Sequence, residues 1–237
     1  MLSSTVLSAR GRNPLKASRA VRAEVRRRGQ QPGNIAYVYG AKVDRDWQVS
    51  SLLELAALLT AEATQDITSY SCDVDVIWEE LSTEGFRGSK PDVRIQRLKS
   101  PRELWEVKHA NDIENDPRAK KHAAVQSRIA QELGYTWNCF TEADALSQRV
   151  MLMNWLSIST VLDECRSLKV PTLESEISSF VSERKRVQLA QVYAQFEVPR
   201  KQAFTALMRA HQQRQLTVQI KSHPVTGSTL IVPWSAP

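Results

Sequence analysis

The middle of the chain carries two carboxylates and one lysine whose spacing could bring them together. Asp92 follows Pro91 at the start of one predicted strand, and Glu106 comes fourteen residues later in another, two positions before Lys108. Alternate side chains of a strand point to the same face, so we expect Glu106 and Lys108 to point the same way. If the two strands pair as a hairpin, Asp92 lies beside Glu106.

These are the residue types that hydrolysis of a phosphodiester requires. Carboxylate oxygens are the ligands of Mg²⁺ and Mn²⁺, and a bound metal ion lowers the pKa of water and offsets phosphate charge. The Lys108 ammonium can orient the attacking water or offset oxyanion charge. Glu54, in a helix predicted before the strands, can add a third carboxylate. Acids this close repel each other and one pKa rises, so we expect a cation between them.

A structural alternative stays open at this stage. The pattern Pro-Asp followed by Glu-x-Lys occurs by chance, and Glu106 and Lys108 could form an ion pair on a solvated hairpin, contributing about 0–1 kcal/mol. The surroundings favour the chemical interpretation, because the strands are apolar enough to pack against a core and a helix with Lys120 and Lys121 follows. We expect these two lysines to offer cations to a DNA backbone.

Hydrophobic periodicity indicates an α/β domain around these residues. Apolar residues recur at helical spacing over residues 47–63 and 117–133 and alternate with polar ones in the predicted strands. The strands are predicted at residues 67–79, 91–98, 104–108 and 135–140, with a turn at residues 84–90. Helices thus come before and between strands, and the domain ends near Gln148.

The last third of the chain has a different pattern. Helices are predicted at residues 172–182, 185–197 and 199–214, and strands at residues 216–220 and 230–232. Helices followed by a β-hairpin indicate a winged helix-turn-helix arrangement.

The predicted helix at residues 199–213 could enter the major groove of DNA. Its apolar stripe leaves five polar residues for solvent or DNA: Arg200, Lys201, Thr205, Arg209 and Gln212. Of these we expect Arg200, Lys201 and Arg209 to bind DNA. A helix packed for protein interaction, with a solvated basic face, is the alternative.

The chain is basic, with 32 Lys and Arg residues against 26 Asp and Glu residues and a formal net charge of +6. Residues 1–46 are predicted to form a basic arm. Within it, Arg26, Arg27 and Arg28 are candidates for contact with a DNA backbone. A solvated tail with no nucleic-acid partner is equally compatible with this composition.

Cysteine usage and hydropathy indicate an intracellular protein. Cys72, Cys139 and Cys165 are far apart and odd in number, which favours reduced thiols over a disulfide framework or a zinc site. No stretch approaches the roughly 20 apolar residues that cross a bilayer, and the N-terminus lacks the apolar segment of a secretory signal. We expect a cytoplasmic location and no membrane contact.

Taken together, the central motifs resemble those of TnsA, the endonuclease subunit of heteromeric transposases. The resemblance covers residues 47–148. It is carried by residues 50–55 (SSLLEL), 67–70 (ITSY), 90–93 (KPDV), 104–108 (LWEVK), 134–135 (GY) and 140–142 (FTE). The Gln-Pro pair that the family often has after the position of Tyr70 is replaced here by Cys72 and Asp73.

The resemblance implies a metal-dependent DNA endonuclease of the PD-(D/E)xK superfamily. Its fold would be a restriction-endonuclease-like mixed sheet flanked by helices, in the α/β class. Glu54, Asp92 and Glu106 would be the ligands of Mg²⁺ or Mn²⁺, and together with Lys108 they would be the catalytic residues.

The resemblance also implies a division of labour on the double-stranded DNA of transposon ends. A TnsB-like, integrase-type partner would cut and join the 3′ ends, while this chain cuts the 5′ ends. Residues 47–150 would form the nuclease domain, and residues 151–237 a C-terminal winged-helix-like domain that contacts a TnsC-like AAA+ regulator. Two alternatives stay open: a stand-alone phage or plasmid nuclease of the same fold, and a non-catalytic winged-helix DNA-binding scaffold protein.

Overall fold

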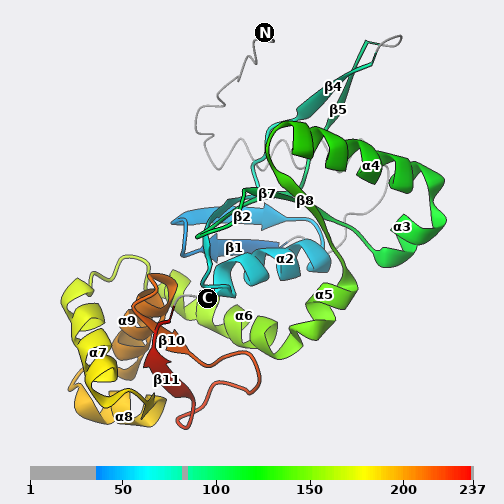
Figure 1. Ribbon diagram of the computed structural model, residues 1–237. Helices are drawn as coiled ribbons and strands as arrows, with labels where there is room; N and C mark the ends of the chain where they lie inside the picture. The colour runs from blue at the N-terminus through cyan, green and yellow to red at the C-terminus, as the bar shows by residue number, and fades with distance from the viewer. Residues whose placement is uncertain (1–35, 82–84, 236–237) are drawn as a thin grey trace.

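A four-stranded mixed sheet forms the centre of the first part of the chain in the computed structural model, which describes residues 36–81 and 85–235 (Figure 1). The strand order is β3-β6-β7-β8, with β8 parallel to β7 and the other neighbours antiparallel. Their bounds are β3 (Ile67–Ser71), β6 (Val93–Arg97), β7 (Glu103–Val107) and β8 (Thr136–Phe140). Arg26, Arg27 and Arg28 of the predicted arm lie outside the described residues.

Helices cover both faces of this sheet. Helix α2 (Leu52–Ala63) packs on one face, where Trp105 belongs to the same core cluster. Helix α4 (Pro117–Glu132) follows the short helix α3 (Ala110–Asn115) and covers the other face, where Leu104 packs with Ala130. The predicted α/β class is thereby confirmed as a mixed sheet flanked by helices.

Helix α2 begins later than the sequence pattern predicts. Residues 47–51 are not helical, because β2 (Arg45–Val49) pairs antiparallel with β1 (Ala36–Gly40) and buries Trp47 and Val49. The Ser51 hydroxyl then caps α2 by accepting a hydrogen bond from the Glu54 N–H at 3.0 Å. This hairpin includes the last residues of the predicted arm.

Two further predictions are wrong: the length of the strand at residues 67–79 and the turn at residues 84–90. The segment predicted as one strand at residues 67–79 is divided between β3 and β4 (Ile77–Leu81), because the Ser71 hydroxyl binds the Asp73 N–H in a local turn. The turn predicted at residues 84–90 is largely strand β5 (Gly85–Ser89), which pairs with β4. The β4–β5 hairpin projects from the main sheet (Figure 1).

The C-terminal part alternates helices with a small three-stranded sheet. The elements are α5 (Glu142–Ser147), α6 (Arg149–Glu164), α7 (Pro171–Arg184), β9 (Val187–Gln188), α8 (Leu189–Gln195), α9 (Arg200–Gln212), β10 (Leu216–Val218) and β11 (Leu230–Pro233). The sheet has the order β10-β11-β9, and both pairings are antiparallel. The helix predicted at residues 185–197 begins only at Leu189, because Lys185 has a φ of 63° and Val187 pairs with Ile231.

The two parts of the chain share a core. Leu59 and Ala63 of α2 belong to one apolar cluster with Trp155 of α6 and Leu207 of α9. Polar contacts join the same elements, because the Glu62 carboxylate accepts a hydrogen bond from Gln212 at 2.7 Å. The C-terminal end of α2 is therefore fixed by residues from the last third of the chain. No helix within residues 36–81 and 85–235 is long and apolar enough to cross a membrane.

Candidate functional site

Strand pairing brings Asp92 to the end of β7. The Asp92 N–H donates to the Trp105 carbonyl oxygen at 2.9 Å, which extends the β6–β7 ladder by one residue. The Asp92 side chain turns towards the same strand, where its Oδ2 accepts the Val107 N–H at 2.7 Å. One carboxylate oxygen is thus held by the backbone between Glu106 and Lys108, and Oδ1 is left outside that hydrogen bond.

Glu106 lies on the face of β7 that α4 covers, and its side chain is buried. Gln126 of α4 donates from Nε2 to Glu106 Oε2 at 2.8 Å. The other oxygen, Oε1, lies 3.8 Å from Lys108 Nζ. The expectation that Glu106 and Lys108 point the same way agrees with this contact. Since Glu106 is only 9% exposed, the ion pair does not belong to a solvated hairpin.

The surroundings of Asp92 raise its pKa to about 7. Burial is the largest cause, and the nearby charges of Glu106 and Glu54 add to it, while the Val107 N–H and Lys108 act in the opposite direction. The charges of both Glu106 and Glu54 therefore act on the Asp92 carboxylate. A positive ion there would favour the ionised form of Asp92.

Glu54 reaches this place from the first turn of α2. Its carboxylate accepts hydrogen bonds from the backbone N–H of Ser50 at 2.7 Å and from the Ser50 hydroxyl at 2.8 Å. Glu54 and Asp92 line one small cavity of about 170 Å³, together with Cys72 and Lys90. In this structure Glu54 also helps to fix the start of α2, so its carboxylate has a structural role as well.

The pair Asp92 and Glu106 has the donor chemistry for a divalent cation. In each carboxylate one oxygen accepts a hydrogen bond from the protein: Asp92 Oδ2 from the Val107 N–H, and Glu106 Oε2 from Gln126. The other oxygen of each carboxylate takes no part in that hydrogen bond. Mg²⁺ commonly takes only one or two carboxylates and completes its shell with water and phosphate oxygens. Within the described residues, no group of three or more His, Cys, Asp or Glu side chains is arranged to hold a metal ion. A site here would therefore rest on two carboxylates unless Glu54 changed its partners.

Lys108 is positioned by the sheet beyond the end of β7. Its backbone N–H donates to the Phe140 carbonyl oxygen at 3.0 Å, so the chain stays extended alongside β8. Next to it, the Glu142 carboxylate accepts the Ala110 N–H at 3.0 Å and lies 3.6 Å from His109 Nδ1. Lys108 therefore has buried Glu106 as its ion-pair partner, and the next residue along the chain, His109, lies beside the more exposed Glu142.

The basic residues predicted to bind DNA have different surroundings. Lys120 and Lys121 are exposed on α4. On α9, Arg200 is exposed and its guanidinium lies over the Tyr193 ring, and Lys201 forms an ion pair with Glu164.

Arg209 binds the protein's own backbone. It donates to the carbonyl oxygens of Leu168 and Cys165, next to the C-terminal end of α6. The expectation that Thr205 and Gln212 face solvent or DNA is wrong. Both are buried, because α9 packs on more than one side and Gln212 reaches Glu62.

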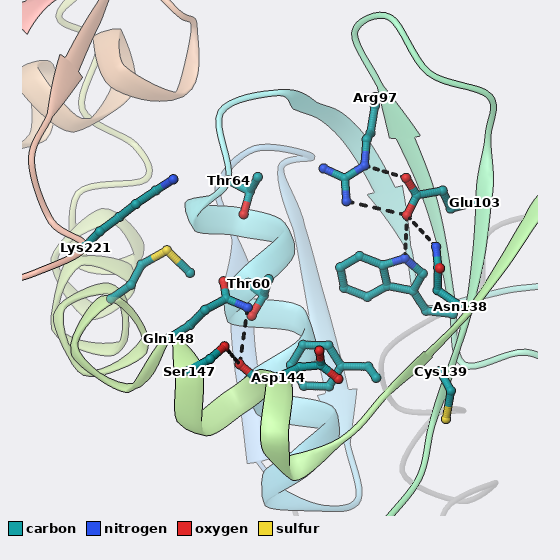
Figure 2. Close-up of a pocket in the computed structure, with 13 residues that line it drawn as sticks. Thr60, Thr64, Arg97, Glu103, Asn138, Cys139, Asp144, Ser147, Gln148 and Lys221 are labelled. Carbon is teal, nitrogen blue, oxygen red and sulfur yellow. Dashed lines mark hydrogen bonds and ion pairs between the residues drawn. The ribbon is translucent and has the colours of Figure 1, made fainter. Parts of the chain in front are cut away.

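A larger cavity of about 620 Å³ lies on the other face of β7. Figure 2 shows Glu103 on its wall, where the carboxylate accepts hydrogen bonds from Arg97, Asn138 and the Trp105 indole. The polar groups on this wall are therefore hydrogen-bonded to one another. None of the four candidate catalytic residues lines the cavity. Lys221 extends towards it from the C-terminal part of the chain.

Sequence reasoning missed two polar residues near the site. Gln126 is 0% exposed and contacts Glu106. The signal that could have found it is a glutamine inside the apolar stripe of the helix that includes Ala119 and Ile129. The second is Cys72, for which the sequence predicts only a reduced thiol. Burial raises its pKa to about 12, and the charges of Glu54 and Asp92 add to this shift.

The three cysteines carry no disulfide. Cys165 is buried, and Cys72 and Cys139 are partly buried. Comparison of the whole sequence with known proteins finds no family model that matches and no curated protein of significantly similar sequence.

Proposed function

We propose that this chain is a metal-dependent DNA endonuclease that acts as the TnsA-like subunit of a heteromeric cut-and-paste transposase. The observation that carries the proposal is the meeting of Asp92, Glu106 and Lys108 at the end of β7, with Glu54 near enough to act on Asp92. Acids and a lysine in this relation suit phosphodiester hydrolysis better than a purely structural role, because burying like charges together is unfavourable without a cation.

In the proposed mechanism, Asp92 and Glu106 would hold Mg²⁺ or Mn²⁺. When bound, the ion would supply a water of lowered pKa and positive charge against the phosphate. The Val107 N–H fixes the Asp92 carboxylate, and Lys108 would offset negative charge on the reacting phosphate. For Glu54 to act as a third ligand, its carboxylate would have to give up its hydrogen bonds to Ser50.

The element order supports the finer fold assignment. Apart from the β4–β5 hairpin after β3 and the short helix α3 before α4, the order is α2-β3-β6-β7-α4-β8: a helix, three antiparallel strands, a helix and a parallel strand. This order suits the restriction-endonuclease-like core that we propose. In the C-terminal part, α7-β9-α8-α9-β10-β11 is an order that suits a winged-helix-like domain, with the segment between β10 and β11 as its wing.

The proposed partners follow from the same assignment. The substrate would be double-stranded DNA at transposon ends, with exposed Lys120 and Lys121 of α4 near its backbone. A TnsB-like subunit would cut and join the 3′ ends, and a TnsC-like AAA+ regulator would contact the C-terminal part. Because much of α9 is buried and Arg209 binds backbone carbonyl oxygens, the surface of this part favours docking of a protein over reading of bases.

A cleavage assay on element-end DNA tests the proposed function. The full chain is incubated with Mg²⁺, with and without the integrase-like partner, and 5′-end cleavage is measured for wild type and for the variants Asp92→Asn and Lys108→Ala. We expect wild type to cut and both variants to lose at least a hundredfold in rate. Asp75→Asn, a change of an exposed aspartate nearby, is the matched control and should cut like wild type.

The same assay separates the alternatives. Cutting by the variants at the wild-type rate would contradict the assignment of the site. Efficient cutting by wild type without any partner would favour a stand-alone nuclease. No cutting under any condition, together with binding of element-end DNA, would favour a non-catalytic scaffold.

A further inference from the structure

Gln126 is an unusual residue for its place in α4. Most of this helix faces solvent, and its buried positions include the small or apolar residues Ala119, Ile129 and Ala130. Gln126 is 0% exposed among them. A buried amide is costly unless its polar atoms find partners, so the contacts of this side chain have to account for its position.

The contacts define which way the amide points. The Trp137 indole Nε1–H of β8 donates to Gln126 Oε1 at 3.0 Å. An indole N–H can only donate, so the oxygen of the amide must face Trp137. The amide nitrogen Nε2 then faces β7, where it donates to Glu106 Oε2 at 2.8 Å. Trp137 thus orients Gln126, and Gln126 orients Glu106.

This chain of hydrogen bonds decides which oxygen of Glu106 is presented to the site. Oε2 is engaged by Gln126, whereas Oε1 is the atom that lies 3.8 Å from Lys108 Nζ. Without the amide donor, the carboxylate could rotate about its last torsion, since such terminal torsions are broad. It would also be buried with one hydrogen bond fewer.

We propose that Gln126 is a positioning residue that fixes the Glu106 carboxylate for divalent-cation binding, and that Trp137 fixes Gln126. The inference rests on the proposed function, because it assigns Glu106 to a cation. Groups that orient metal-ligating carboxylates affect metal affinity about 10–100-fold when they are changed. Gln126 contacts neither DNA nor cation in this scheme, and acts only through Glu106.

Calorimetric titration of the full chain with Mn²⁺ tests this proposal. Gln126→Leu keeps the approximate size of the side chain but removes the amide, and with it the hydrogen bonds to Glu106 and Trp137, and we expect Mn²⁺ affinity to fall by about tenfold or more. Trp137→Phe makes the ring smaller and removes the indole donor but leaves Gln126 able to donate to Glu106, so we expect a loss smaller than that of Gln126→Leu but still more than about twofold. Gln131→Leu changes an exposed glutamine of the same helix and should leave the affinity unchanged.

Cleavage kinetics distinguish a positioning role from a merely structural one, because they measure kcat and KM separately. We expect Gln126→Leu to lower kcat with little change in KM for DNA, because the DNA surface is intact. If Gln126→Leu does not fold, Trp137→Phe decides the question with the same measurements. Affinity within twofold of wild type in a folded Gln126→Leu or Trp137→Phe variant would overturn the positioning role alone. A wild-type chain that binds no Mn²⁺ would overturn the proposed function as well.

Discussion

At the scale of single residues, Asp92 combines a structural and a proposed chemical role. Its side chain accepts a hydrogen bond from the Val107 N–H at the end of β7 and is partly buried. The pKa of about 7 means that a substantial fraction of Asp92 is protonated near neutral pH. A cation that binds this carboxylate must therefore displace a proton, which makes binding depend on pH.

We expect the affinity for Mn²⁺ to rise between pH 6 and pH 8. Raising the pH through the pKa of Asp92 ionises the carboxylate, and only the ionised form binds the metal ion. Calorimetry at several pH values, in buffers of different ionisation enthalpy, measures both the affinity and the proton released. Asp75→Asn should behave like wild type. A pH-independent affinity over this range would show that Asp92 is not the group that binds.

His211 gives a second prediction at this scale, one that concerns stability. It is 2% exposed, and its Nδ1 accepts the Val218 N–H at 3.1 Å. Burial lowers its pKa to about 3, with the charges of Lys42 and Lys221 acting in the same direction, against the Ala63 carbonyl oxygen. Because the folded pKa is below the unfolded value of about 6.5, the unfolded state takes up a proton first as the pH falls.

Stability is therefore expected to fall below about pH 6.5, by up to about 1.4 kcal/mol per pH unit for this one group. Urea unfolding of wild type and His211→Gln between pH 7 and pH 5 measures the effect. We expect a shallower dependence on pH in the variant. Equal slopes in the two proteins would mean that another group causes the dependence.

At the scale of elements, α2 links the candidate site to the rest of the fold. Glu54 is in its first turn, and Glu62 near its other end is 1% exposed. The Glu62 carboxylate accepts hydrogen bonds from the Tyr70 hydroxyl at 2.7 Å, from the Lys42 N–H and from Gln212. Lys42 Nζ in turn donates to two carbonyl oxygens at the C-terminal end of the helix. These contacts fix the C-terminal end of α2, and thereby the position of the helix that carries Glu54.

Tyr70→Phe is expected to lower the free energy of unfolding by about 1.5–3 kcal/mol, the usual range for a hydrogen bond to a charged group. The change leaves Glu62 buried with one donor fewer and adds no bulk. Tyr37→Phe alters a tyrosine that is 71% exposed and should have almost no effect. Denaturant unfolding of both variants makes the comparison, and equal stabilities would contradict the role given to this contact.

At the scale of the whole molecule, the sequence was informative where the signal is local. The alternating pattern around Val93 and Ile95 and the spacing from Asp92 to Glu106 were sufficient to place the two carboxylates on neighbouring strands. The sequence pattern predicts neither strand of the β1–β2 hairpin, and the helix predicted at residues 47–63 overlaps the end of β2, where Trp47 and Val49 are too few residues to define a strand by their alternation. Only pairing with residues 36–40 decides between the two structures.

Contacts between distant parts of the chain could not be predicted from one sequence. Gln212 and Glu62 are 150 positions apart, and nothing in the local pattern of α9 indicates that its polar face is buried against α2. The same holds for Gln126, whose partners come from two strands. Sequence patterns predict Asp92, Glu106 and Lys108 as candidate catalytic residues, but not the residues that contact and orient their side chains.

The proposed function requires Asp92 and Glu106 to bind a divalent cation beside Lys108. Anomalous diffraction at the manganese edge, from crystals of the full chain grown with Mn²⁺, locates such an ion. We expect an anomalous peak between the carboxylates of Asp92 and Glu106, and no such peak in Asp92→Asn. A peak confined to another part of the molecule, or no peak when Mn²⁺ is in large excess, would contradict the proposed function.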